Sequence, residues 1–144
     1  MSEELYHLGV KALIRRDDGA VLLLRVDPQK MGGGEHWDLP GGRVGKGSTV
    51  EETLRREVLE ETGVSDLTIG KNIGMMFSTW RIKEDGGEFG LILSVYECTI
   101  PRGTTITLGN MHVGYDWFPP AKAARQYIAS KYPPEFCELI ATLQ

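Results

Sequence analysis

Apolar residues in the N-terminal part of the chain fall into two short runs, which predict two strands. One is centred on residues 10–14, and the other is the nearly continuous apolar segment 20–26. A run of this length with few polar interruptions is typical of a strand buried on both faces. The sequence DDG at 17–19 is typical of a turn between the two strands. Residues 27–35, which are rich in glycine, are predicted to form a loop.

The pattern of polar and apolar residues from 49 to 62 predicts a helix. The segments 48–51 and 49–52 both match the capping box, in which Ser or Thr is followed three residues later by Glu. Either segment can therefore begin the helix. Gly63 suits the position just beyond a helix end, where a left-handed backbone favours glycine.

Strands are predicted again farther along the chain, at 73–83 and 88–100. The sequence DGG at 85–87 is typical of a hairpin turn between them. A further short strand is predicted at 115–118. Strands therefore dominate the middle of the chain.

Two Pro-Pro pairs, at 119–120 and 133–134, predict two further helices, because proline suits a first helical turn. The first should run to about Ser130 and the second to the end of the chain. Strands flanked by helices predict an α/β (α+β) sandwich. A length of 144 residues is expected for one domain, so residues 1–144 are predicted to form a single domain.

Charge and composition restrict the partners of such a domain. The net charge is −4, so no overall positive field would attract a nucleic acid polymer, and a polyanionic small molecule would need a local cation. The N-terminus lacks the basic and apolar regions of a signal peptide, and no run approaches 18 apolar residues, so no membrane segment is expected. Cys98 and Cys137 match neither a metal site nor a disulfide framework, which favours free thiols and a cytoplasmic location.

Residues 41–64, GGRVGKGSTVEETLRREVLEETGV, combine glycines, a lysine and a run of carboxylates. Phosphate could be wrapped directly by the glycines and Lys46, or held through metal ions that the carboxylates bind. A P-loop has the pattern G-x-x-x-x-G-K followed by Ser or Thr. Here Gly47 follows Lys46, and Pro40 stands where the first glycine is required, so the P-loop interpretation fails.

Three carboxylates of the predicted helix, Glu57, Glu60 and Glu61, share an arc of roughly 100° because their spacing is i, i+3, i+4. At an effective dielectric constant near 20, two such charges about 5 Å apart repel by about 3 kcal/mol. A hard cation such as Mg²⁺ or Mn²⁺ removes this repulsion and prefers oxygen ligands. The alternative is a solvated face in which Arg56 pairs with Glu60, and the spacing alone leaves both interpretations open.

The stretch resembles the Nudix box, G-x5-E-x7-R-E-U-x-E-E-x-G-U, where U is a bulky aliphatic residue. Counted from Gly42, every fixed position matches except one, because Ser48 stands where the pattern has Glu. The sequence LPG at 39–41, just before the box, also resembles the family. So does the strand-rich frame around it, and the resemblance therefore covers most of the chain.

The resemblance implies a Nudix-type α/β/α sandwich with a mixed β-sheet. It also implies hydrolysis of a nucleoside diphosphate linked to another group, with Mg²⁺ or Mn²⁺. Carried over by position, Arg56 would orient a carboxylate, and either Glu57 or Glu60 would act as the base that takes a proton from water. The metal ligands would be Gly41 through its carbonyl, Glu57, Glu60 and Glu61. Many relatives are dimers, so the resemblance leaves a homodimer open.

Ser48 is the one departure from the box. Its hydroxyl offers no negative charge to a metal or to Arg56, although it can cap the helix or hold a water molecule. The departure leaves the number of bound metals open. It also keeps open a relative that binds nucleotides without hydrolysing them.

Residues outside the box are the candidates for binding the nucleotide. Trp37 and Trp80 could stack on a base, Arg25 could touch a phosphate, and Asp116 could read a base edge. For each there is an ordinary alternative, which is core packing for the tryptophans and a solvated surface position for the charged residues.

Two glutamates on the predicted strand 88–100, Glu88 and Glu97, could supply a further metal ligand or base. The stretch 78–81, STWR, lacks the proline that ADP-ribose hydrolases of the family tend to have there. The short chain and the loop before the box favour a MutT-like hydrolase of a nucleoside triphosphate, ordinary or oxidised. An ADP-ribose or nucleotide-sugar pyrophosphatase is the alternative enzyme.

Overall fold

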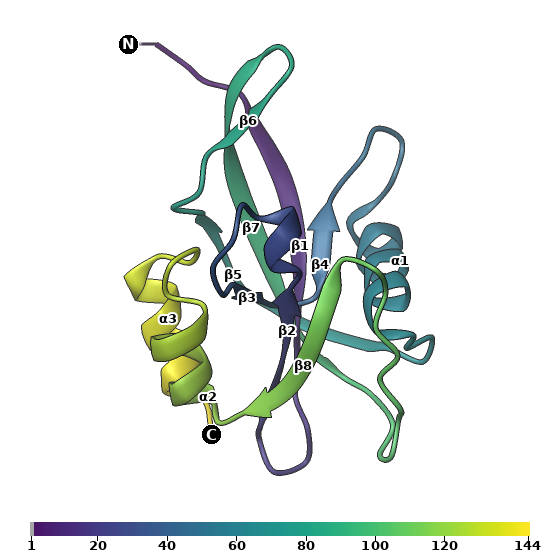
Figure 1. Ribbon diagram of the computed structural model, residues 1–144. Helices are drawn as coiled ribbons and strands as arrows, with labels where there is room; N and C mark the ends of the chain where they lie inside the picture. Colours follow the sequence, from purple (N-terminus) through teal and green to yellow (C-terminus); the bar gives the residue numbers. More distant parts are fainter. Residues whose placement is uncertain (1) are drawn as a thin grey trace.

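The computed structural model describes residues 2–144, and its larger sheet has five strands (Figure 1). Four of them follow the order β4-β1-β7-β5, and β6 pairs with the N-terminal end of β7. β1 and β7 run parallel while all other pairs are antiparallel, so the sheet is mixed. The strands are β1 (Tyr6–Ile14), β4 (Gly41–Arg43), β5 (Thr68–Phe77), β6 (Ile82–Glu84) and β7 (Gly87–Thr99).

A second, antiparallel sheet has the order β3-β2-β8. Its strands are β2 (Val21–Val26), β3 (Trp37–Asp38) and β8 (His112–Phe118). β2 contributes alternate side chains to two different apolar clusters, Val21 and Leu23 to one and Leu22 and Leu24 to the other. The prediction that this strand is buried on both faces is therefore confirmed.

Helices lie on both sides of the strands (Figure 1). Helix α1 (Val50–Thr62) lies on one side, and α2 (Pro120–Lys122) and α3 (Pro134–Ala141) lie on the other. The predicted α/β/α sandwich with a mixed sheet is confirmed. Among residues 2–144, none of the helices is both long and apolar enough to cross a membrane.

The core consists of two apolar clusters, one under each helical layer. Under α1, its buried Leu54 and Val58 meet the even-numbered residues of β1, which include Val10 and Ile14. The other cluster joins α3 to the odd-numbered residues of β7 and to Leu39. Both cysteines are free, as predicted, and the structure buries them.

The strand predicted at 73–83 is wrong in its position, because β5 begins at Thr68 and ends at Phe77. Residues 68–72 are mostly polar and exposed, so no apolar alternation marks them as a strand. Pairing with β7 along the sheet edge is what extends them. The strand predicted at 115–118 likewise begins earlier, at His112.

The helix predicted from 119 to 130 is shorter than expected. Helix α2 continues only through one π-helical turn, Ala123–Tyr127. Beyond that turn the chain enters the interior, where Lys131 and Tyr132 reach a buried carboxylate. No local sequence pattern predicts that the chain turns inward at this point. Helix α3 also ends early, at Ala141. Residues 28–30 of the predicted loop form a 3₁₀ turn.

Candidate active site

Helix α1 begins and ends where its sequence predicts. Thr49 is the N-cap, and its side chain accepts a 3.1 Å hydrogen bond from the backbone N–H of Glu52. Gly63 ends the helix with φ of 75°, and its N–H donates to the carbonyl of Leu59. The later of the two capping boxes is therefore the one used, and Ser48 lies in the turn before the helix.

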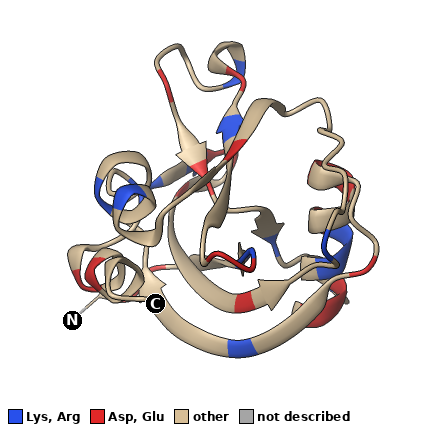
Figure 2. Cartoon of the chain, turned by 90° about the horizontal axis from the view of Figure 1, so that it is seen from below, with Lys and Arg blue, Asp and Glu red and all other residues tan. Residues whose placement is uncertain are grey.

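The buried stripe of α1 fixes where its carboxylates point. Leu54 and Val58 are fully buried beneath the helix. Glu57 and Glu61, next to this stripe, are partly buried, whereas Glu60 is exposed. Figure 2 shows that α1 also carries basic positions, so the helix is not uniformly negative. Glu57 and Glu61 therefore lie at the edge of the contact between α1 and the sheet, and Glu60 lies farther out in solvent.

Two glycines of β4 form the surface on which these carboxylates lie. A Cβ on Gly41 would lie 2.0 Å from the carbonyl oxygen of Val10, and its φ of 149° disfavours any side chain. A Cβ on Gly42 would lie 2.5 Å from the carboxyl carbon of Glu57. Glycine at both positions lets β4 pack on β1 and lets Glu57 approach the backbone.

Glu61 is bound to the same strand by a hydrogen bond of 2.9 Å, which the backbone N–H of Gly41 donates to its Oε1. Burial raises the pKa of Glu61 to about 7, and Glu57 adds to the rise. The positive charge of Lys11 and the Gly41 N–H oppose the rise without cancelling it. Glu61 is therefore a carboxylate whose negative charge is poorly compensated by the protein.

Glu57 shares this property. Burial, followed by the charge of Glu60, raises its pKa above the ordinary range, and Arg56 partly opposes the rise. The guanidinium of Arg56 lies 3.8 Å from the carboxylate of Glu57 and 4.0 Å from that of Glu60. Arg56 therefore contacts both carboxylates, as an orienting residue would.

The donor set suits a hard divalent cation. Carboxylate oxygens and a backbone carbonyl are the ligands that Mg²⁺ and Mn²⁺ prefer, and the raised pKa values of Glu57 and Glu61 show that added positive charge there is favourable. In the chain from residue 2 onward, no three His, Cys, Asp or Glu side chains already form a group that could hold a metal ion. A cation at this site would therefore require the side chains to rotate toward it.

Comparison with known proteins shows the family to which the chain belongs. The model of the NUDIX domain matches residues 5–138. The chain belongs to the Nudix family. A Bacillus subtilis (strain 168) relative, named "Putative 8-oxo-dGTP diphosphatase", is 37% identical over 118 residues, which are 82% of this chain and 70% of that protein.

Two further similarities support the Nudix assignment. Proteins of Mycobacterium tuberculosis named "Putative 8-oxo-dGTP diphosphatase 2" are 38% identical over 72 residues, 49% of this chain, and the match spans about half (50%) of their length. The MutT protein from Methanosarcina mazei Go1 has a similar structure, with a TM-score of 0.75 and 28% identity over 97% of this chain and 94% of that one.

Of the four predicted nucleotide-binding residues of this Nudix chain, Trp37 and Arg25 lie on paired strands. The ring of Trp37 packs edge-on against Phe118 at 5.3 Å, which is the core packing considered as its alternative. Asp116 is exposed on β8, and its Oδ1 accepts a hydrogen bond from the next backbone N–H. Trp80 lies in the segment between β5 and β6 and contacts Lys131.

The other two glutamates considered as ligands have basic partners. Glu88 lies 3.4 Å from Arg81, and Glu97 lies 3.4 Å from Arg15.

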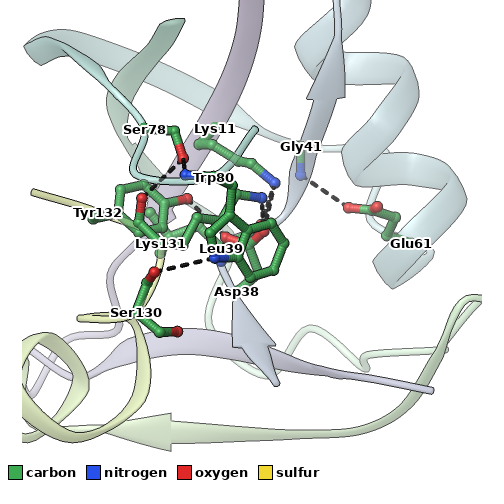
Figure 3. Close-up of polar contacts among 10 residues, drawn as sticks. All are labelled: Lys11, Asp38, Leu39, Gly41, Glu61, Ser78, Trp80, Ser130, Lys131 and Tyr132. Carbon is green, nitrogen blue, oxygen red and sulfur yellow. Dashed lines mark hydrogen bonds and ion pairs between the residues drawn. The ribbon is translucent and has the colours of Figure 1, made fainter. Parts of the chain in front are cut away.

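A buried polar cluster next to the Nudix box was missed by the sequence analysis (Figure 3). Its centre is Asp38, whose carboxylate accepts hydrogen bonds from Lys11 at 3.0 Å, from Lys131 and from Tyr132 at 2.7 Å. Burial opposes a charge on Asp38, but the two ammonium groups outweigh it and hold its pKa well below the usual range. Lys11, a lysine inside the apolar run of β1, is the feature of the sequence that could have indicated this cluster.

Two cavities are lined by other parts of the fold. One cavity, of about 600 Å³, adjoins the β1–β2 turn, and its lining includes Arg16, Arg102 and Trp117. The other, of about 630 Å³, is an apolar space between β5 and α3 that includes Met76 and Phe136. The carboxylates of α1 line neither of them.

Proposed function

We propose that the chain hydrolyses a nucleoside triphosphate, ordinary or oxidised, to a nucleoside monophosphate and pyrophosphate. The observation that carries this proposal is the placement of Glu57 and Glu61 against Gly41 and Gly42, where two carboxylates with raised pKa values share one surface. The names of the Bacillus subtilis and Mycobacterium tuberculosis relatives support a nucleoside triphosphate substrate.

In this proposal Mg²⁺ or Mn²⁺ is held by carboxylate oxygens of Glu57, Glu60 and Glu61 and by the carbonyl of Gly41. When bound, the cation neutralises phosphate charge and makes water a better nucleophile. Arg56 keeps Glu57 and Glu60 in place from the side. Gly42 provides room for Glu57 beside the backbone, and the N–H of Gly41 fixes Glu61.

The base that accepts a proton from the attacking water is either Glu57 or Glu60. A base works best when its pKa is near the working pH, and burial moves the pKa of Glu57 in that direction. Glu60 is more exposed, with 60% of its side chain accessible, and can rotate more freely. Glu57→Gln and Glu60→Gln, compared at saturating metal, would separate these roles by the loss in kcat.

Trp80 is the proposed platform for the nucleobase. It is partly exposed, and its contact with Lys131 links it to Asp38 and so to the segment before Gly41 (Figure 3). Stacking on an aromatic ring is worth about 1–3 kcal/mol per base. Trp80→Leu should therefore raise KM by about 5- to 150-fold with a smaller change in kcat. A variant with unchanged KM would remove Trp80 from the substrate site.

The deciding experiment incubates the protein with Mg²⁺ or Mn²⁺ and nucleoside triphosphates, 8-oxo-dGTP, ADP-ribose and nucleotide sugars, and separates the products by chromatography. Nucleoside monophosphate with pyrophosphate is the expected result. A sugar phosphate as co-product would instead identify an ADP-ribose or nucleotide-sugar pyrophosphatase.

Ser48 supports a second candidate, a nucleotide-binding protein without turnover, because it lacks the carboxylate of the box pattern. Thermal stabilisation by nucleotide with no product from any substrate would favour this candidate. In that case Ser48→Glu is expected to create hydrolysis, and a variant that stays inactive would show that the missing carboxylate is not what prevents turnover. If the wild type does hydrolyse a substrate, an unchanged rate in Ser48→Glu would show that the site functions without a carboxylate at this position.

A further inference from the structure

Lys11 lies on β1 with its ammonium group beside the segment that leads into the Nudix box. Only 7% of the residue is exposed. Its Nζ donates to Oδ2 of Asp38 at 3.0 Å and to the carbonyl oxygen of Leu39 at 3.2 Å. A buried ammonium is costly unless it is paired and hydrogen-bonded, so these two bonds hold the side chain in one place.

The rest of Lys11 lies against Gly41. The two residues are register partners in the β1–β4 pair. A Cβ on Gly41 would lie 2.9 Å from both Cα and Cδ of Lys11, so the lysine stem occupies the space that a side chain there would need. The next residue, Ala12, donates its N–H to the carbonyl of Pro40 at 2.8 Å. Lys11 and its neighbour thus contact each residue from 38 to 41.

Lys131 provides a natural comparison. Its Nζ also donates to Oδ2 of Asp38, and it is buried to a similar extent, with 8% exposed. Its ammonium group also lies over the ring of Trp80, 4.7 Å from the centroid. Unlike Lys11, it makes no hydrogen bond to the backbone of residues 39–41 within the described chain.

We propose that Lys11 is a positioning residue for the metal site, which it supports by holding Leu39–Gly41 so that the N–H and carbonyl of Gly41 keep their places beside Glu61. The proposal rests on the metal site described under the proposed function. Outer groups that orient metal ligands typically change metal affinity by about 10- to 100-fold when removed. Lys11 would act in this way through the backbone, without touching the metal or the substrate.

The test compares Lys11→Met with Lys131→Met. Each variant removes one ammonium from the same carboxylate oxygen and keeps an apolar stem of similar length, so each should lower stability. Mn²⁺ binding is measured by calorimetry and by electron paramagnetic resonance, without substrate. We expect about 10- to 100-fold weaker Mn²⁺ binding in Lys11→Met and less than about threefold weaker binding in Lys131→Met.

The Mn²⁺ affinities of the wild type and of the two variants separate the metal site from the role of Lys11. If the wild-type protein binds no Mn²⁺, the proposed metal site fails, and this inference fails with it. If the wild type binds Mn²⁺ and Lys11→Met binds it equally well, only the inference is overturned. Equal losses in both variants would also overturn it, because they would reduce Lys11 to a structural partner of Asp38.

A second variant is needed if Lys11→Met does not fold. In Lys11→Gln the side chain keeps a polar donor but is uncharged and one atom shorter, so its amide lies farther from both Asp38 Oδ2 and the Leu39 carbonyl than the ammonium does. We expect it to fold and to bind Mn²⁺ at least about tenfold more weakly than the wild type. A folded Lys11→Gln variant with wild-type affinity would contradict the proposal.

Discussion

Glu61 lies between a backbone N–H, a buried ammonium and a second carboxylate, and burial dominates the balance among them. Its folded-state pKa of about 7 exceeds the ordinary value of 4.5, so folding favours the protonated form. The resulting contribution to stability is complete below pH 4.5 and is lost as the pH rises through 7. At neutral pH and above, an ionised Glu61 therefore costs stability that a bound cation would restore.

This balance predicts how Glu61→Gln should behave in the presence of a chelator. The amide keeps an acceptor for the Gly41 N–H and is neutral at every pH. The variant should resemble the wild type at pH 4 and exceed it in unfolding free energy by up to about 3 kcal/mol at pH 8. Urea unfolding across this pH range measures the difference.

One control accompanies this prediction. Added Mg²⁺ should stabilise the wild type more than Glu61→Gln at pH 8. A constant difference between wild type and Glu61→Gln at all pH values would contradict the assigned pKa.

The two glycines of the site predict opposite effects of alanine. In Gly42→Ala the new Cβ meets the end of a flexible Glu57 side chain, which can move aside. Stability should fall by less than about 1 kcal/mol, while displacement of a metal ligand or base lowers kcat by at least about tenfold. Gly41→Ala meets backbone at 2.0 Å and should cost more than about 2 kcal/mol. Denaturation and kinetics on both variants check this contrast, and a stable Gly41→Ala would refute it.

At the scale of elements, α1 depends on its cap. The hydroxyl of Thr49 satisfies the N–H of Glu52, which otherwise has no partner within the helix. Thr49→Ala should therefore lower the unfolding free energy by about 1 kcal/mol. Ser48→Ala, one residue earlier, is the matched control and should have little effect, since Thr49 and not Ser48 is the N-cap. Equal losses in the two variants, measured by urea unfolding, would mean that the cap is misassigned.

At the scale of the whole molecule, the cluster around Asp38 joins parts of the chain that are far apart in sequence. It connects β1 and β3 to the segment that precedes α3, through Lys11, Lys131 and Tyr132. Such a cluster fixes how the α3 side of the sandwich sits on the sheets. Its removal should therefore affect global unfolding and not one helix alone.

Asp38→Ala would leave two buried ammonium groups without their shared partner. Breaking a buried ion pair by removing one member typically costs about 3–5 kcal/mol, so we expect a loss of that size in a single cooperative transition. Asp38→Asn keeps the acceptor oxygen and should lose less. Circular dichroism and fluorescence followed through urea unfolding would test this, and a loss below about 1 kcal/mol for Asp38→Ala would show that the lysines find other partners.

The sequence alone determined the features that depend on near neighbours along the chain. The end of α1 at Gly63 and its acidic edge follow from residues within one or two helical turns, and the structure confirms Gly63. The cap was limited by the sequence to Ser48 or Thr49, and the structure selects Thr49. The box pattern identified the family correctly for the same reason, since its residues lie in one continuous segment. The roles of Glu57, Glu60 and Glu61 toward metal stay predictions.

Only the tertiary structure decided the features that depend on contacts between distant segments. Residues 68–72 become strand because β7 pairs with them, and the second helix ends early because Lys131 and Tyr132 must reach Asp38. The raised pKa of Glu61 likewise requires burial against β4, a strand outside its own helix that the folding of the turn before α1 brings against it. Local propensity carries no information about such partners, because burial and charge pairing arise only once the layers have assembled.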